Sequence, residues 1–175
     1  MLEFMSGKLA LTIKNIVPEH PASYAVLKFA ISVVLNVVFI IGLTLAVSLL
    51  TDRTGEALQI LISFALLRQV SGGAHLKSGM ACILFTATLF TILSFVEVSS
   101  LYVMLMNAAS LLTVLWLAPI GIERQTRIPR RHWPKLKLIA LLLVGTNIII
   151  GSPVIAASFL AQSVSLIVAR REVNT

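Results

Sequence analysis

Charged side chains are scarce in this chain of 175 residues. Only 12% of the residues are Asp, Glu, Lys or Arg, whereas 58% are hydrophobic. A soluble domain carries about 25% charged residues, which help to cover its surface with polar groups. This composition excludes an ordinary water-soluble domain and indicates that a lipid bilayer surrounds most of the chain.

Cysteine is nearly absent, because Cys82 is the only one in the chain. A single cysteine excludes an intrachain disulfide and any zinc site built from several cysteines, and we predict neither a metal nor a cofactor. An unpaired thiol fits a position that faces the cytoplasm, where thiols stay reduced.

Acidic residues are also few, with 7 Asp and Glu against 14 Lys and Arg, for a net charge of +7. A basic chain could bind nucleic acid. Here, however, the basic residues lie in short connections beside apolar runs, where the positive-inside rule places them. We find no nucleic-acid motif, so we expect the lipid bilayer as a partner and no nucleic acid.

Long uncharged runs predict an all-α fold, a polytopic integral membrane helical bundle that forms a single domain over residues 1–175. About six membrane-embedded helices are expected, at residues 29–50, 57–71, 78–96, 98–122, 138–150 and 154–169. The run from 138 to 169 is too long for one ordinary span. Its Gly151-Ser152-Pro153 break favours a helical hairpin over one kinked, tilted helix. The apolar part of 57–71 is short, so either Arg68 snorkels to the membrane face or the helix is re-entrant.

The N-terminal residues 1–20 combine apolar side chains at roughly helical spacing with Lys8 and Lys14. This pattern predicts an amphipathic helix in the membrane interface, and it lacks the features of a cleaved signal peptide. With a cytoplasmic N-terminus and six spans, every Lys and Arg except Arg53 falls on the cytoplasmic side. The charge distribution therefore predicts that both termini are cytoplasmic.

The stretch from Arg68 to Cys82 is the least lipid-like interior part of the chain and contains His75. Because a thiolate is the reactive form of cysteine, groups that favour the charged form are informative. His75 could act as a general base, and Arg68 and Lys77 supply positive charge. Ser78 is a candidate N-cap for the helix that follows, and Cys82 would lie just past its first turn, near the positive end of the helix dipole.

The spacing of His75 and Cys82 constrains their geometry. Seven residues of continuous helix would separate them by roughly 10 Å along the axis. A nucleophile and its base need about 3 Å. We therefore predict a non-helical segment around residues 72–77, made accessible by Gly72 and Gly73, and a helix that begins near Ser78.

Simpler interpretations compete with a catalytic one. A lone cysteine in a membrane helix is usually a packing residue, and a cysteine–histidine pair is a weak motif without its context. A small transporter, channel or assembly factor is an alternative, in which Asn36, Asn107 and Asn147 would line a path. Against this alternative, we find no inverted repeat and no charge in the middle of a span.

The pattern R-x-x-S-G-G-x-H-x-x-x-x-x-x-C from Arg68 to Cys82 resembles the signature of the accessory gene regulator B family. These are integral-membrane cysteine endopeptidases of Gram-positive bacteria that process precursors of quorum-sensing peptides. The resemblance covers nearly the whole chain, including the amphipathic N-terminus and Ala118-Pro119 before a basic loop. One departure is Ala74, where we expect an aromatic residue, and this concerns substrate fit more than chemistry.

The resemblance implies that His75 and Cys82 are catalytic and that Arg68 and Gly73 support activity, in a multi-pass protein of the bacterial plasma membrane. Cys82 would attack a peptide bond of a small membrane-associated propeptide and form a thioester. A thiol or hydroxyl of the substrate would then release a cyclic thiolactone or lactone. A homodimer, and an inactive member that binds a peptide without cutting it, stay open. The group that orients His75 cannot be identified from the sequence.

Overall fold

The computed structural model describes residues 2–74, 78–121 and 128–174, and this part of the chain is helical. The helices are α1 (Leu2–Ile16), α2 (Tyr24–Leu50), α3 (Thr54–Ser71), α4 (Gly79–Leu93), α5 (Ser100–Leu117), η2 (Arg130–His132), α6 (Trp133–Ile150) and α7 (Pro153–Asn174). The described residues form no strand beyond one isolated bridge between Gly72 and Ile120. The predicted all-α membrane bundle is therefore confirmed.

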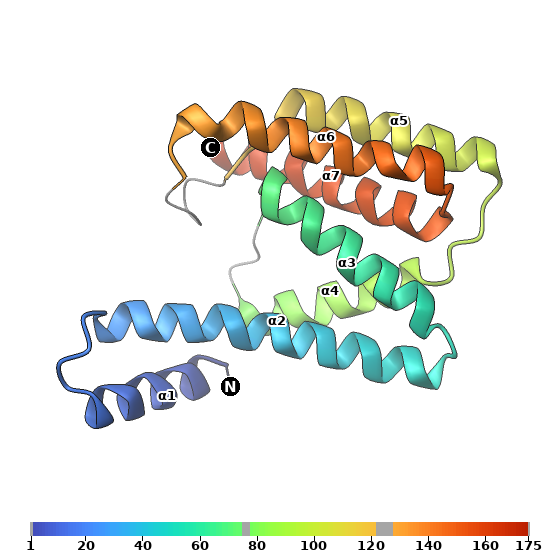
Figure 1. Ribbon diagram of the computed structural model, residues 1–175. Helices are drawn as coiled ribbons and strands as arrows, with labels where there is room; N and C mark the ends of the chain where they lie inside the picture. Colours follow the sequence, from blue (N-terminus) through green and yellow to red (C-terminus); the bar gives the residue numbers. More distant parts are fainter. Residues whose placement is uncertain (1, 75–77, 122–127, 175) are drawn as a thin grey trace.

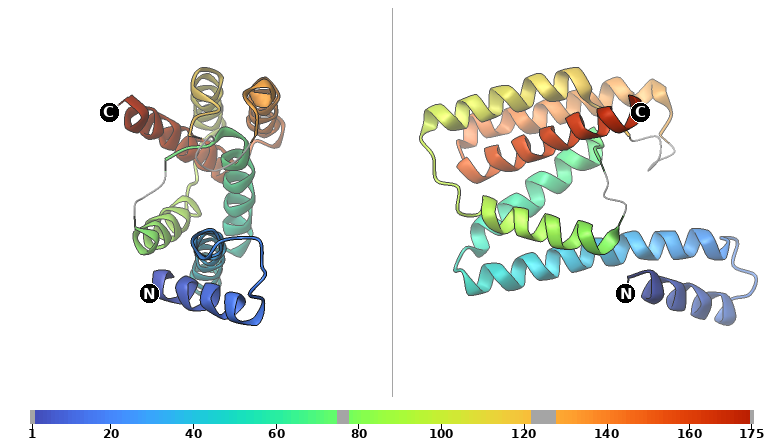
Figure 2. Two further views of the ribbon diagram at one scale, coloured as in Figure 1. Left: turned by 90° about the vertical axis from the view of Figure 1, so that its left-hand side faces the viewer. Right: turned by 180° about the vertical axis from the view of Figure 1, so that it is seen from behind.

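The helices form two layers that α3 joins (Figures 1 and 2). One layer contains α1, α2 and α4, and the other contains α5, α6 and α7. α3 crosses obliquely between them and packs on α6 and α7 on one side and on α2 and α4 on the other. This arrangement makes the C-terminal end of α3 the point where the two layers meet.

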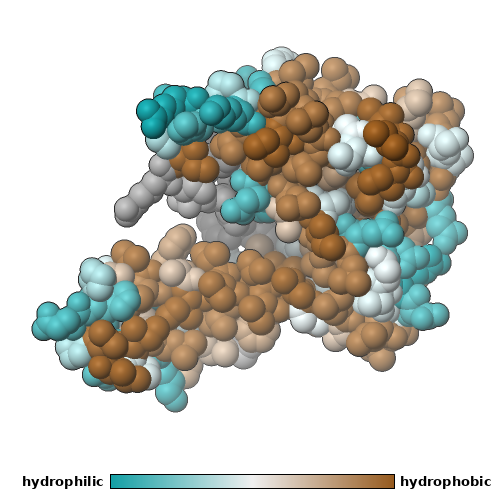
Figure 3. Space-filling view, in the orientation of Figure 1, coloured by the Kyte–Doolittle hydropathy of each residue, from teal (hydrophilic) through white to brown (hydrophobic). Residues whose placement is uncertain are grey.

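Successive helices from α2 to α7 run in opposite directions, so their connections gather at two ends of the bundle (Figure 1). One end holds the connections at residues 51–53, 94–99 and 151–152. The other end holds the end of α3, the starts of α4 and α6 and the end of α7. Hydrophilic residues gather toward both ends and hydrophobic ones between them, as a membrane protein requires (Figure 3).

Four helical segments of the described chain are long and apolar enough to cross a membrane. They are α2, the segment Arg130–Ile150, α5 and α7, and the apolar helix α4 is shorter. α1 packs against α2, and its expected place in the membrane interface stays a prediction.

Several helices begin or end away from the expected bounds. Those bounds are the ends of uncharged runs, and a helix need not begin or end where an uncharged run does. α2 starts at Tyr24, where the Ser23 side chain accepts a hydrogen bond from the Val26 nitrogen. α5 ends at Leu117 rather than near 122, and α6 starts at Trp133 rather than 138. The predicted break after residue 150 is present: Gly151 adopts a left-handed φ of 69° between two helices. The region 138–169 is thus a hairpin and not one kinked helix.

Two buried asparagines hold this hairpin against α5. The Asn147 Nδ2 donates to Asn107 Oδ1 at 3.1 Å and to the Ser152 carbonyl at 3.0 Å, and the Ser152 nitrogen donates to Asn147 Oδ1. Both asparagines are almost fully buried. Because their polar groups bond to each other and to the turn, these residues join helices and do not line an open path.

Candidate active site

The segment after α3 leaves the helical conformation at two glycines. α3 ends at Ser71, Gly72 has a φ of 77° and Gly73 a φ of 132°. α4 begins at Gly79, so the predicted helix start near Ser78 is confirmed, and the predicted non-helical segment is confirmed for residues 72–74. His75 and Lys77 lie outside the described residues, and the distance between His75 and Cys82 stays a prediction. We refer to residues 72–74 as the glycine segment.

The glycine segment pairs with the chain that follows α5. The Gly73 nitrogen donates to the Ile120 carbonyl at 3.1 Å, and the Ile120 nitrogen donates to the Ser71 carbonyl at 3.0 Å. These bonds satisfy backbone groups that no helix serves at this point. The segment is therefore fixed by a second stretch of main chain nearly fifty residues away.

Two side chains of α7 hold the glycine segment from the other side. The Gln162 Nε2 donates to the Gly72 carbonyl at 2.6 Å and to Ser71 Oγ at 3.0 Å. The Ala74 nitrogen donates to Ser165 Oγ at 3.1 Å and to the Ser165 carbonyl at 3.3 Å. Gln162 is completely buried.

Arg68 points into this cluster, and its position relative to the membrane face stays a prediction. Its guanidinium donates to Gln162 Oε1 at 3.3 Å, to Ser165 Oγ at 3.2 Å and to the Ala74 carbonyl. It also lies 5.9 Å from the centre of the Phe64 ring. α7 thus supplies neutral acceptors that compensate the guanidinium for lost water.

The partners of Arg68 within the described residues are uncharged. Arg53, by contrast, pairs with two carboxylates, Glu56 at 3.3 Å and Glu97 at 2.9 Å. A half-buried guanidinium without a carboxylate partner keeps its positive charge available to an anion. Arg68 lies within electrostatic range of a thiolate at Cys82.

Cys82 is the fourth residue of α4, close to the predicted position just past the first turn. Its nitrogen donates to the Ser78 carbonyl at 2.9 Å, and Ser78 is the N-cap, accepting a hydrogen bond from the Ala81 nitrogen at 3.5 Å. The thiol is half-buried, and its Sγ lies 4.0 Å from Thr86 Oγ1. The thiol therefore lies close to the N-terminal end of α4, where the helix dipole is positive.

Two other elements fix the start of α4. The Asn36 Nδ2 of α2 donates to the Gly79 carbonyl at 3.1 Å, so this asparagine serves the packing of α4. A side chain at Gly79 would lie 3.1 Å from a methyl group of Leu2 in α1. The N-terminal helix therefore approaches the chain three residues before the thiol.

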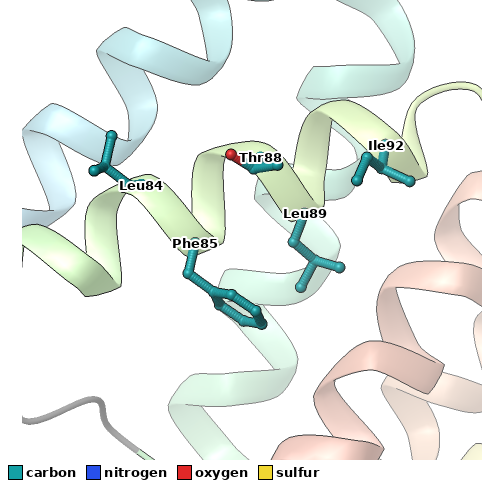
Figure 4. Close-up of a pocket in the computed structure, with 5 residues that line it drawn as sticks. All are labelled: Leu84, Phe85, Thr88, Leu89 and Ile92. Atoms are coloured by element: carbon teal, nitrogen blue, oxygen red, sulfur yellow. The ribbon is translucent and has the colours of Figure 1, made fainter.

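A shallow apolar depression runs along the outer surface of α4 beyond Cys82 (Figure 4). It is lined by Leu84, Phe85, Thr88, Leu89 and Ile92. Phe85 and Leu89 follow Cys82 at three and seven residues, so they share its side of the helix. The thiol is thus adjacent to a surface that suits an apolar or membrane-bound molecule.

Gln162, Ser165 and Ile120 are site residues that sequence reasoning missed. The available signal was weak: Gln162 is a strongly polar residue inside a long uncharged run, which is unusual in a membrane helix. Its partner could not be identified, because 90 residues separate it from Gly72. No group of three or more His, Cys, Asp or Glu side chains in the described part could hold a metal ion.

Comparison with known proteins is consistent with the motif. A family model described as Accessory gene regulator B matches residues 5–169. A "Putative AgrB-like protein" of Halalkalibacterium halodurans is 31% identical over 152 residues, covering 86% of this chain and 77% of the relative. The "Accessory gene regulator protein B" of Staphylococcus carnosus is 26% identical over 133 residues, covering 74% of this chain and 69% of the relative. No solved structure matches the chain.

Proposed function

This chain belongs to the accessory gene regulator B family, and we propose that it is a membrane-embedded cysteine endopeptidase acting on a small quorum-sensing propeptide. Family membership supports a role in processing the autoinducing peptide of that system. The observation that carries the proposal is the position of the one thiol in the chain. Cys82 is the fourth residue of a helix, and the chain just before His75 is held in a non-helical conformation.

In the proposed reaction, His75 takes the proton of the Cys82 thiol, and the thiolate attacks a carbonyl carbon of the propeptide. The peptide bond breaks, His75 returns the proton to the leaving amine, and the N-terminal part remains as a thioester on Cys82. A thiol or hydroxyl of the substrate then attacks this thioester. The products are a cyclic thiolactone or lactone and the free Cys82 thiol.

Groups near Cys82 can stabilise the negative charges that this reaction creates on the sulfur and on the carbonyl oxygen. The positive charge of Arg68, whose partners are neutral, would stabilise the negative charge that develops during attack. The amide groups of Gly79 and Met80 open α4 and, as first-turn amides, lack partners within the helix, so they are candidate donors to the oxyanion. Ser78 keeps this helix start in place, and Lys77 adds positive charge from outside the described residues.

The proposal places the site at the cytoplasmic face of the plasma membrane, with both termini cytoplasmic. The end of α3 and the start of α4 lie at the same end of the bundle as the starts of α2 and α6 and the end of α7 (Figure 1). That end carries Lys28, Arg130, Arg131, Lys135, Lys137, Arg170 and Arg171. A propeptide made in the cytoplasm would reach the thiol from the inner leaflet along the apolar face of α4.

The contacts of three asparagines argue against the competing function, a small transporter or channel. Asn107 and Asn147 bond to each other inside the bundle, and Asn36 bonds to the start of α4. Each of the three asparagines that would have lined a path therefore has a structural partner. An inactive member that binds a peptide without cutting it stays an alternative, and activity measurements decide it.

The experiment that tests the proposal is co-expression with the product of a neighbouring small open reading frame. The wild-type protein should cleave that propeptide, and Cys82→Ala and His75→Ala should each abolish cleavage while membrane insertion persists. Cys82→Ser should keep little activity, because a hydroxyl needs a stronger base. Full processing by Cys82→Ala would refute the peptidase function.

A further inference from the structure

The glycine segment is attached to α7 through side chains that no part of the motif includes. Ser165 Oγ accepts two hydrogen bonds, one from the Ala74 nitrogen and one from Arg68. Gln162 bonds Arg68 through its oxygen, and Ser71 and Gly72 through its nitrogen. Two residues of one helix thus bond to Arg68, Ser71, Gly72 and Ala74.

We propose that Gln162 and Ser165 are positioning residues for the chemistry at Cys82, acting through Arg68 and through the backbone that leads into His75. The inference rests on the proposed peptidase function and identifies what holds the backbone of Ala74, the described residue next to His75 in the sequence. Ala74 immediately precedes His75. Its nitrogen is held by Ser165 and its carbonyl by Arg68, so both peptide groups of Ala74 are fixed. The direction in which the chain enters His75 is fixed with them.

Side chains of α7 lie very close to the backbone of Gly73. A β-carbon on Gly73 would lie 2.7 Å from Ser165 Oγ, 3.1 Å from Arg68 Nη1 and 3.2 Å from Gln162 Nε2. α7 therefore approaches the backbone of the glycine segment itself. This approach explains why the second motif glycine cannot carry a side chain.

Helix association alone does not require these two residues. α3 and α7 are also joined by Ser63 and Ser158, whose Oγ atoms lie 2.6 Å apart, roughly one turn away from Arg68 and Gln162. That pair binds the same two helices and does not contact the glycine segment. Ser163, next to Gln162, is buried, and among the described residues its Oγ donates to the Phe159 carbonyl of its own helix. It provides a matched control for the loss of a serine hydroxyl in α7.

The neutrality of both side chains is part of the proposal. A glutamate at position 162 could still accept from Arg68, but it could not donate to Gly72 or Ser71. It would also compensate the positive charge that the site keeps available to the thiolate. Gln162→Glu therefore provides a second variant that changes few atoms.

The test uses the full chain in proteoliposomes, where Cys82 is the only thiol. We measure alkylation of Cys82 by N-ethylmaleimide at neutral pH, amide hydrogen exchange at Ala74, and kcat and KM for the propeptide. Loss of two hydrogen bonds in Ser165→Ala should lower the alkylation rate and kcat about tenfold, with little change in KM. Exchange at Ala74 should become faster. Gln162→Glu should lower both rates at least as much, Ser165→Thr should restore them, and Ser163→Ala should match wild type.

A wild-type alkylation rate in Ser165→Ala overturns the inference, whatever the exchange result. An equal loss in Ser163→Ala also overturns it, because the effect would then belong to α7 packing in general. Failure of the peptidase proposal is visible separately as cleavage by Cys82→Ala. In that case the alkylation and exchange measurements still decide whether α7 positions the groups around the thiol.

Discussion

The backbone nitrogen of Ala74 lies 3.1 Å from the Oγ of Ser165, although 91 residues separate the two in the chain. This bond joins the residue before His75 to the last transmembrane helix. The chemistry proposed for the motif therefore depends on where α7 packs. Variants of the glycine segment and of α7 should consequently share one defect.

Gly73→Ala should abolish cleavage. Its φ of 132° is disfavoured for any other residue, and the new β-carbon would lie 2.7 Å from Ser165 Oγ. The measurement is propeptide cleavage together with thermal unfolding in detergent. Gly145→Ala in α6 is the matched control, because nothing lies within 4 Å of its β-carbon. That variant should cleave normally, and an active Gly73→Ala protein would contradict the close approach of α7.

Asn147→Ala should destabilise the bundle without changing the chemistry. It removes the buried bond to Asn107 and both bonds to Ser152. In a membrane protein this loss should lower the free energy of unfolding by about 1 kcal/mol. Thermal unfolding measures the loss, and cleavage per folded molecule should stay at the wild-type level. A double-mutant cycle with Asn107→Ala should show strong coupling. Additive losses would mean that the two asparagines act independently.

The connections at residues 51–53 and 94–99 should face outward. A single cysteine at Thr54, in a Cys82→Ala background, should react with an impermeant thiol reagent added to intact cells. Cysteines at Lys137 and Arg170 should react only after the cells are opened. Labelling at Arg170 from outside would contradict the even number of crossings and the cytoplasmic C-terminus.

The ion pairs of Arg53 should be insensitive to pH near neutrality. Hydrogen bonds to Glu97 first, and to Glu56 second, raise the pKa of Arg53 above its usual value. The ion pairs therefore contribute their full stability at every pH below the ordinary arginine pKa. This stability is lost only as the pH rises through the raised pKa of Arg53, far into the alkaline range. Glu97→Gln should accordingly show the same small effect on thermal unfolding from about pH 7 to 9. A change across that range would point to another group.

Much of the architecture could be predicted from the residues, because the driving interactions are local. The uncharged runs predict the helices, the Gly151 break predicts the hairpin, and helical rise at residues 75 and 82 predicts the interruption before α4. The contacts of Arg68 could not be predicted. Whether its side chain reaches the membrane face or turns inward depends on Gln162 and Ser165, whose proximity only the packed bundle creates. Helix ends such as Trp133 were missed because charge alone does not end a helix.

The most direct measurement is intact-protein mass spectrometry of the wild-type protein during turnover of its propeptide. The proposed mechanism predicts a transient adduct on Cys82, with the mass of the N-terminal part of the propeptide, that neutral hydroxylamine removes as a thioester. The adduct should be absent in Cys82→Ala and reduced in Ser165→Ala. A propeptide that is processed normally by Cys82→Ala, with no adduct on any residue of the wild-type protein, would contradict covalent catalysis by this cysteine.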